Sequence, residues 1–169
     1  LAVAAGRVLW PDQPFAVMTA PTAAALLWSI GSSLAAYPHS HSYFNELAGG
    51  PANGHHHLLS SNVDYGEDLL YLRDWLRAHA PGRPVTLAYF GNFDPRIAGL
   101  EFTLPPQSPD RRARGDVPEA ELGPLPGLHV VSVNYLHGPS VPLHDGRGGR
   151  SYGDDYSYFL EFEPTARVG

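Results

Sequence analysis

Polar side chains that could bind a ligand gather between residues 43 and 68, in the run YFNELAGGPANGHHHLLSSNVDYGED. Four oxygen-bearing side chains lie within seven residues: Asn62, Asp64, Glu67 and Asp68. A hard cation such as Ca²⁺ prefers such ligands. The spacing nevertheless differs from an EF-hand loop, because Gly66 falls at the fifth position instead of the sixth and no acid occupies the twelfth. Capping of a following helix by Asp64 is the simpler interpretation, and we predict no metal here.

The same loop has a second interpretation, as part of a ligand-binding crevice. If a strand precedes the loop, its polar groups lie at the carboxyl edge of a sheet, where open α/β folds bind ligands. Asn134 and His137 follow another predicted strand and would face the same crevice. The alternative for these two is hydrogen bonding that closes the strand end near Gly138. The predicted crevice residues are Asn62, Asp64, Tyr65, Asp68, Asn134 and His137.

Two further groups near the start of this stretch carry polar chemistry. Asn45 and Glu46 could bind a sugar hydroxyl, and the Glu46 carboxylate could transfer a proton; alternatively, Glu46 could pair with an arginine and have a structural role. The tract 55–57 is three successive histidines, but adjacent side chains point in different directions and seldom converge on one ion. We therefore predict solvated loop histidines.

Composition excludes several function classes. The chain has 169 residues and a net charge of −6, which argues against a nucleic-acid partner. It contains no cysteine, so disulfides, thiolate metal sites and a cysteine nucleophile are absent. Neither a phosphate-binding glycine loop nor a Gly-x-Ser-x-Gly elbow occurs, so we expect no nucleotide cofactor, or any other, and no serine hydrolase.

The first part of the chain is long and free of charge. No Asp, Glu, Lys or Arg occurs between Gln13 and Asn45, and residues 15–37 are rich in Ala, Ser and Thr. About 20 residues suffice to cross a bilayer, so we predict a last transmembrane helix at 15–37. Residues 1–14 would then be the tail of a preceding span and a short loop. A buried Ala-rich helix of a soluble protein is the alternative.

Residues 38–169 are predicted to form a small α/β domain. Its mostly parallel sheet is expected at 57–62, 84–90 and 128–135, because these runs are short, apolar and rich in β-formers. Helices are expected at 66–79 and at 152–162, the first from the apolar spacing of Leu69, Leu72 and Leu76. Residues 105–127 and 138–151 are predicted loops. We expect the domain to be truncated before a final strand.

Several blocks occur in the order typical of one family: PHSHSYFNELAGGPANG, SNVDYGEDLLYLRDWL, LAYFGNFDP, VSVNYLHG and FLEFEPTARVG. Together they resemble the C-terminal part of bacterial multi-spanning glycosyltransferases of the GT-C type, related to protein O-mannosyltransferases and the aminoarabinose transferase. The resemblance covers roughly residues 37–169. Two positions depart from the family pattern, with Tyr65 in place of Trp and Glu67 in place of Gln.

The resemblance implies an enzyme of the bacterial inner membrane that transfers a sugar from a polyprenyl-phosphate donor. It places the α/β domain on the extracytoplasmic side and the catalytic carboxylate in an early loop outside this chain, so no residue here is assigned a catalytic role. The implied partners are the remainder of the transmembrane enzyme, the lipid bilayer through 15–37, and a sugar or peptide acceptor. The alternative is a non-catalytic structural or interaction module without a ligand site.

Overall fold

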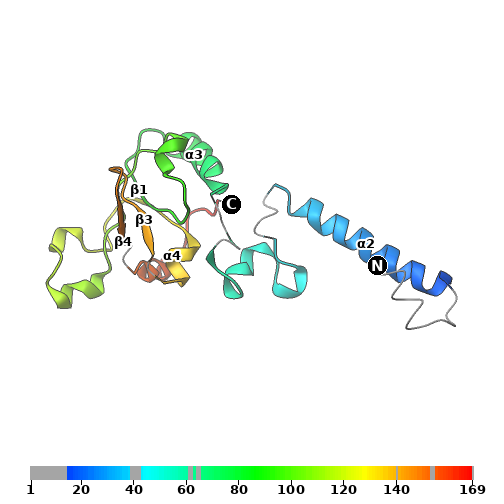
Figure 1. The fold of residues 1–169 in the computed structure, drawn as a ribbon. Coiled ribbons are helices and arrows are strands. Elements are labelled where there is room, and N and C mark those ends of the chain that lie inside the picture. The colour runs from blue at the N-terminus through cyan, green and yellow to red at the C-terminus, as the bar shows by residue number, and fades with distance from the viewer. Residues whose placement is uncertain are drawn as a thin grey trace.

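The computed structural model describes residues 15–38, 43–60, 63, 66–139, 141–152 and 155–168 (Figure 1). Their core is an α/β arrangement around two parallel strands, β1 (Val85–Ala88) and β2 (Leu128–Val131). Val85 is paired with Leu128 and Ala88 with Val131, and a parallel bridge from Thr86 to Thr103 lies beside them. The predicted α/β fold is therefore confirmed, with a smaller sheet than expected.

Strand β1 divides the core into two clusters, because successive side chains of a strand point to opposite faces. Leu87 and Tyr89 face the first cluster, which contains the stripe of α3 (Asp68–His79) formed by Leu69, Leu72 and Leu76. Ala88 faces the second cluster and Phe90 packs against it. Tyr135, Leu143 and Tyr156 complete this second cluster. Figure 1 shows α3 and α4 (Val133–His137) on either side of β1.

A hairpin supports the second cluster. It consists of β3 (Pro142–His144) and β4 (Arg150–Tyr152), which pair antiparallel. The predicted loop at 138–151 was thus wrong at residues 142–144, 150 and 151, because the Gly-rich turn between the two strands brings two short runs together. The predicted loop at 105–127 is mostly exposed and contains the short turns η6 (Pro109–Arg114) and η7 (Glu119–Glu121), with an isolated bridge between Gln107 and Leu122.

Three predicted elements differ from the structure. The described residues of 57–62 form no strand, and a turn, η3 (Pro51–His56), precedes them; Leu58 is half exposed and has no sheet neighbour. The strand at 128–135 ends at Val131, because Ser132 caps α4 by accepting a hydrogen bond from the Asn134 backbone N–H. The helix predicted at 152–162 is only the 3-10 turn η8 (Ser157–Glu161), preceded by β4.

The N-terminal helix α2 (Phe15–Ala35) extends away from the α/β core (Figure 1). Its large apolar side chains from Leu26 to Leu34 are between 56 and 71% exposed. Within the described part of the chain, no helix combines the length and the apolar character needed to span a bilayer. Two short turns, η2 (Glu46–Ala48) and η3, lie between α2 and the core, and η5 (Pro95–Ala98) packs beside α3.

Candidate functional site

Three of the predicted crevice residues, Asn62, Asp64 and Tyr65, lie outside the described residues, so the capping role of Asp64 is untested. Helix α3 begins at Asp68, two residues later than predicted, and its N-cap Glu67 makes no side-chain cap hydrogen bond. Asp68 is partly buried in the first turn. A carboxylate at this end is favoured by the helix dipole, which gives Asp68 a structural reason for its position.

Asn134 is buried, at 4% exposure, and binds backbone instead of facing open space. Its Oδ1 accepts a hydrogen bond from the Ser60 N–H, and its Nδ2 donates to the Ser60 carbonyl at 3.4 Å. Ser60 has a positive φ of 67°, a left-handed conformation that is costly for a residue with a Cβ. The side chain of Asn134 therefore clamps the backbone at Ser60 to α4. The Asn134 backbone carbonyl also accepts from the Gly138 N–H; this bond closes the end of α4, because the strand has already ended at Val131.

His137 belongs to a cluster of three imidazoles. Its ring centroid lies 4.7 Å from that of His55 and 6.3 Å from that of His56, and the latter two rings are 4.0 Å apart. Partial burial, followed by the charges of His56, His137 and Arg167, lowers the pKa of His55. Burial and His56 likewise lower the pKa of His137. Among the described residues, no group of three potential ligands is arranged to hold a metal ion.

His56 and His57 are exposed, as expected for solvated loop histidines, whereas His55 is half-buried in a cluster with His137 that the sequence did not predict. His55 and His56 lie in η3, which packs on α4 and so brings them to His137. Only His57 behaves differently, since its Nε2 lies 3.0 Å from the Ala48 carbonyl oxygen. The cluster therefore connects η3 to α4 in the α/β core.

Asn45, at the start of the polar stretch, caps a turn. The Oδ1 of Asn45 accepts a hydrogen bond from the Ala48 N–H at 3.0 Å, and the Asn45 carbonyl accepts from Ala48 and Gly50. The backbone of Glu46 begins η2, while its side chain lies outside what the structure describes. Asn45 thus has a local structural role, and the chemistry suggested for Glu46 stays a prediction.

A cavity of about 380 Å³ lies beyond the carboxyl end of β1, and we refer to it as the carboxyl-edge cavity. Its walls come from the segment after β1, the hairpin β3–β4 and the clamped Ser60. The residues that line it are Ser60, Phe90, Gly91, Asn92, Val141, Pro142 and Arg150. The cavity therefore occupies the kind of position predicted for the ligand crevice, while its lining differs from the predicted residues.

Tyr135 supports two walls of the carboxyl-edge cavity. Its ring meets Phe90 edge-on at a centroid distance of 6.1 Å, and its hydroxyl lies 3.4 Å from the carbonyl oxygens of Val141 and Pro142, to which it donates. Burial, and then the neighbouring Tyr156, raise the pKa of Tyr135 to about 12. The hydroxyl therefore keeps its proton at neutral pH and remains a donor to the start of β3.

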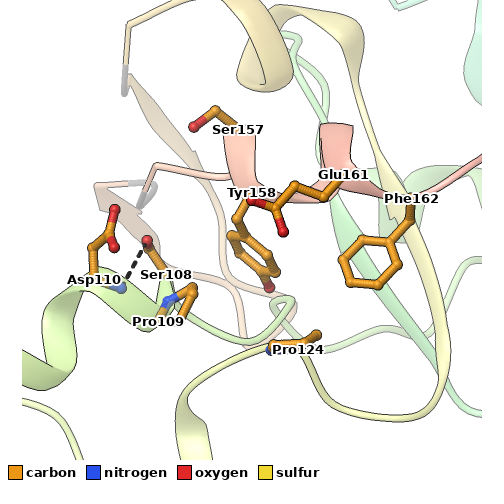
Figure 2. A pocket seen from close by; sticks show the side chains of 8 residues that line it. All are labelled: Ser108, Pro109, Asp110, Pro124, Ser157, Tyr158, Glu161 and Phe162. Atoms are coloured by element: carbon orange, nitrogen blue, oxygen red, sulfur yellow. Dashed lines mark hydrogen bonds between the residues drawn. The ribbon is translucent and has the colours of Figure 1, made fainter.

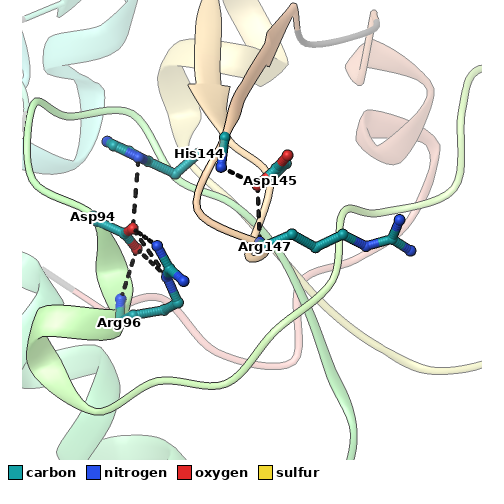
Figure 3. A network of polar contacts seen from close by, with 6 residues as sticks. Asp94, Arg96, His144, Asp145 and Arg147 are labelled. Atoms are coloured by element: carbon teal, nitrogen blue, oxygen red, sulfur yellow. Dashed lines mark hydrogen bonds and ion pairs between the residues drawn. The ribbon is translucent and has the colours of Figure 1, made fainter.

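A polar network fixes the hairpin that carries Arg150 (Figure 3). Arg96 donates to both carboxylate oxygens of Asp94, and the Nδ1 of His144 lies 3.9 Å from the Asp94 Oδ2. Hydrogen bonding from Arg96 lowers the pKa of Asp94 to about 2. In the adjoining turn, Asp145 accepts from the Arg147 N–H, which closes the hairpin.

Arg150 is the charged member of the cavity wall. It is exposed, and no carboxylate in the described part of the chain forms an ion pair with it. The other polar groups that the cavity offers are the hydroxyl of Ser60 and the amide of Asn92, beside the ring of Phe90. This combination suits a small polar ligand with an apolar face, because binding sites pair aromatic walls with a few placed polar groups.

The sequence contained a recognisable signal for some of the cavity residues that were not predicted, but not for others. Gly91 and Asn92 directly follow the clearest predicted strand, 84–90. Because open α/β sheets bind ligands at the carboxyl ends of their strands, this position could have identified them. Arg150 gave no local signal, because its place depends on the hairpin β3–β4.

Comparison of the chain with protein-family models, with curated proteins and with solved structures finds no match.

Proposed function

We propose that this chain is the extracytoplasmic tail domain of a bacterial membrane glycosyltransferase that uses a polyprenyl-phosphate sugar donor. Its part is to assist the binding of the acceptor or the sugar, while catalysis takes place elsewhere in the enzyme. The observation that carries the proposal is the carboxyl-edge cavity, which lies where open α/β sheets bind ligands. The family blocks described above supply the enzyme class.

The lining of the cavity suits a carbohydrate. A sugar ring has apolar C–H faces that can stack on Phe90, and hydroxyls that can bond the Asn92 amide and the Ser60 hydroxyl. The volume of about 380 Å³ falls within the usual range of small-molecule sites, roughly 300–1,000 Å³. One sugar unit, or one end of an acceptor, is the appropriate size of ligand.

Within this proposal, α2 attaches the domain to the membrane part of the enzyme at the bacterial inner membrane. Its apolar side chains, Leu27 and Leu34 among them, are exposed along the described helix. A helix rich in small residues can pack closely against the helices of the membrane part, which would cover these side chains. The remainder of the enzyme and the lipid bilayer are thus the proposed partners of residues 15–37.

The test is a titration of the 169-residue chain with neutral hexoses, a disaccharide and a short Ser/Thr peptide, followed by ¹H–¹⁵N NMR. We expect saturable shifts at residues 90–92 with one of these ligands. Asn92→Ala should weaken binding about three- to tenfold, since one lost hydrogen bond is worth about 1 kcal/mol. Arg147→Gln, an exposed change outside the cavity, is the control. An absence of saturable shifts at the cavity with all three ligand classes would refute assisted binding.

A structural module without a ligand site is the second candidate, and a specific observation favours it. Two of the predicted ligand residues, Asn45 and Asn134, have their amide oxygens bonded to backbone N–H groups. On this alternative, Asn134→Ala destabilises the domain while Asn92→Ala changes nothing measurable in the same titration.

A further inference from the structure

A second cavity, of about 220 Å³, lies beside Tyr158, which packs against the second core cluster. We refer to it as the acidic–aromatic pocket (Figure 2). It is bounded by the start of η6, the turn at Pro124 and the turn η8. The residues that line it are Ser108, Pro109, Asp110, Pro124, Ser157, Tyr158, Glu161 and Phe162. None of them lines the carboxyl-edge cavity.

The central ring of this pocket is held in place before any ligand arrives. The Tyr158 hydroxyl donates to the Pro106 carbonyl at 2.8 Å, and its ring stacks on Phe159 at a centroid distance of 4.3 Å. Gly123 allows this approach, because a Cβ there would lie 2.5 Å from the Tyr158 hydroxyl oxygen. On the opposite wall, buried Ser108 accepts a hydrogen bond from the Asp110 N–H.

The charges of the pocket are all negative. Asp110 and Glu161 are its ionisable carboxylates, and no arginine lines it. The neighbouring arginines pair with other acids among the described residues, Arg111 with Asp116 at 2.6 Å and Arg112 with Glu119 at 3.3 Å. No described basic residue forms an ion pair with Asp110 or Glu161. Both carboxylates can therefore receive a cation from outside the chain.

Figure 2 shows the Glu161 carboxylate beside the ring of Tyr158, with Phe162 on one side of them and Asp110 on the other. Aromatic faces attract ammonium and guanidinium groups, and a carboxylate next to them adds a charge-assisted hydrogen bond. Pro109 and Pro124 supply the apolar surface along which the methylene stem of a lysine-like group can pack.

We propose that the acidic–aromatic pocket binds an organic cation, namely the ammonium or guanidinium group of a basic peptide side chain. Binding forms no covalent bond. The cation contacts the ring of Tyr158 and is neutralised by Glu161, while the charge of Asp110 on the opposite wall adds to the attraction. This site is separate from the carboxyl-edge cavity, so its test does not depend on whether the carbohydrate proposal is correct.

The test is an NMR titration of the 169-residue chain with Nα-acetyl-lysine amide, with Nα-acetyl-norleucine amide as a neutral ligand of similar shape. We expect saturable shifts at residues 158–162 with the lysine compound and much weaker ones with norleucine. Glu161→Gln should weaken lysine binding about two- to fivefold, as expected for a partly exposed ion pair. Combining it with Asp110→Asn should weaken binding about tenfold. Both replacements keep the side-chain shape.

Glu163→Gln is the matched control, since this exposed acid lies two residues beyond Glu161 and outside the lining. It should leave the lysine affinity unchanged. A tripeptide Gly-Lys-Gly and free n-butylamine separate the two sources of an ammonium group, and tighter binding of the tripeptide supports a peptide partner. Equal binding of norleucine and lysine compounds, equal effects of Glu161→Gln and Glu163→Gln, tighter binding of the free amine, or no saturation at all would each overturn the proposal.

Discussion

The clamp between Asn134 and Ser60 joins two segments 74 residues apart and sets one wall of the carboxyl-edge cavity. Asn134→Ala removes both of its side-chain hydrogen bonds to the Ser60 backbone. Each such bond contributes about 1 kcal/mol net, and a backbone group left unsatisfied costs about 1–3 kcal/mol. We therefore expect the free energy of unfolding to fall by about 2–3 kcal/mol, from a total that is typically 5–15 kcal/mol.

Urea denaturation followed by circular dichroism measures this loss directly, as a lower midpoint at an unchanged slope. For a chain of this size, about 2–3 kcal/mol corresponds to a fall in Tm of roughly 5–10 °C. Asn92→Ala is the control, because Asn92 is exposed and its replacement should change stability by less than about 0.5 kcal/mol.

Ser60→Gly separates the clamp from the backbone conformation that it holds. Glycine adopts a positive φ without a Cβ penalty, so this change should leave stability within about 1 kcal/mol of the original protein. Combined with Asn134→Ala, it should reduce the loss caused by the asparagine change. A loss below about 0.5 kcal/mol for Asn134→Ala, or an equal loss for Asn92→Ala, would refute the clamp.

Three further outcomes follow from the structure. Because the pKa values of His55 and His137 are lowered in the folded protein, the unfolded chain binds more protons at acidic pH. The free energy of unfolding should therefore be full above about pH 6.5 and fall as the pH drops below it. Replacing both histidines by Asn should flatten a plot of urea midpoint against pH. Leu87→Ala, at 1% exposure, should cost about 3–5 kcal/mol in calorimetry, whereas Leu47→Ala, at 99% exposure, should cost almost nothing. Gly123→Ala should cost about 1–3 kcal/mol and weaken lysine binding in the NMR titration, because the added Cβ displaces the Tyr158 ring; unchanged shifts at 158–162 would contradict this.

Local patterns in the sequence determined the elements whose stability depends on one apolar stripe or one β-rich run. The spacing of Leu69, Leu72 and Leu76 identified α3, and the two runs that became β1 and β2 were found within a few residues. The apolar spacing and the β-rich composition are properties of residues close together in the chain, so they can be recognised without knowledge of the fold. The predicted crevice was placed at the ends of 57–62 and 128–135, whereas the carboxyl-edge cavity follows β1, so the sequence did not give its position.

Only the tertiary structure decided which side chains meet. The predicted strand at 57–62 failed over its described residues because no partner strand pairs with them, and the predicted helix at 152–162 gave way to a hairpin and a short turn. The grouping of His55 with His137 depends on the packing of η3 against α4. The place of Arg150 in the cavity wall depends on a hairpin closed by Asp145. Such contacts join residues far apart in the chain, and their free energy comes from burial and hydrogen bonding in the assembled fold, which no local pattern encodes.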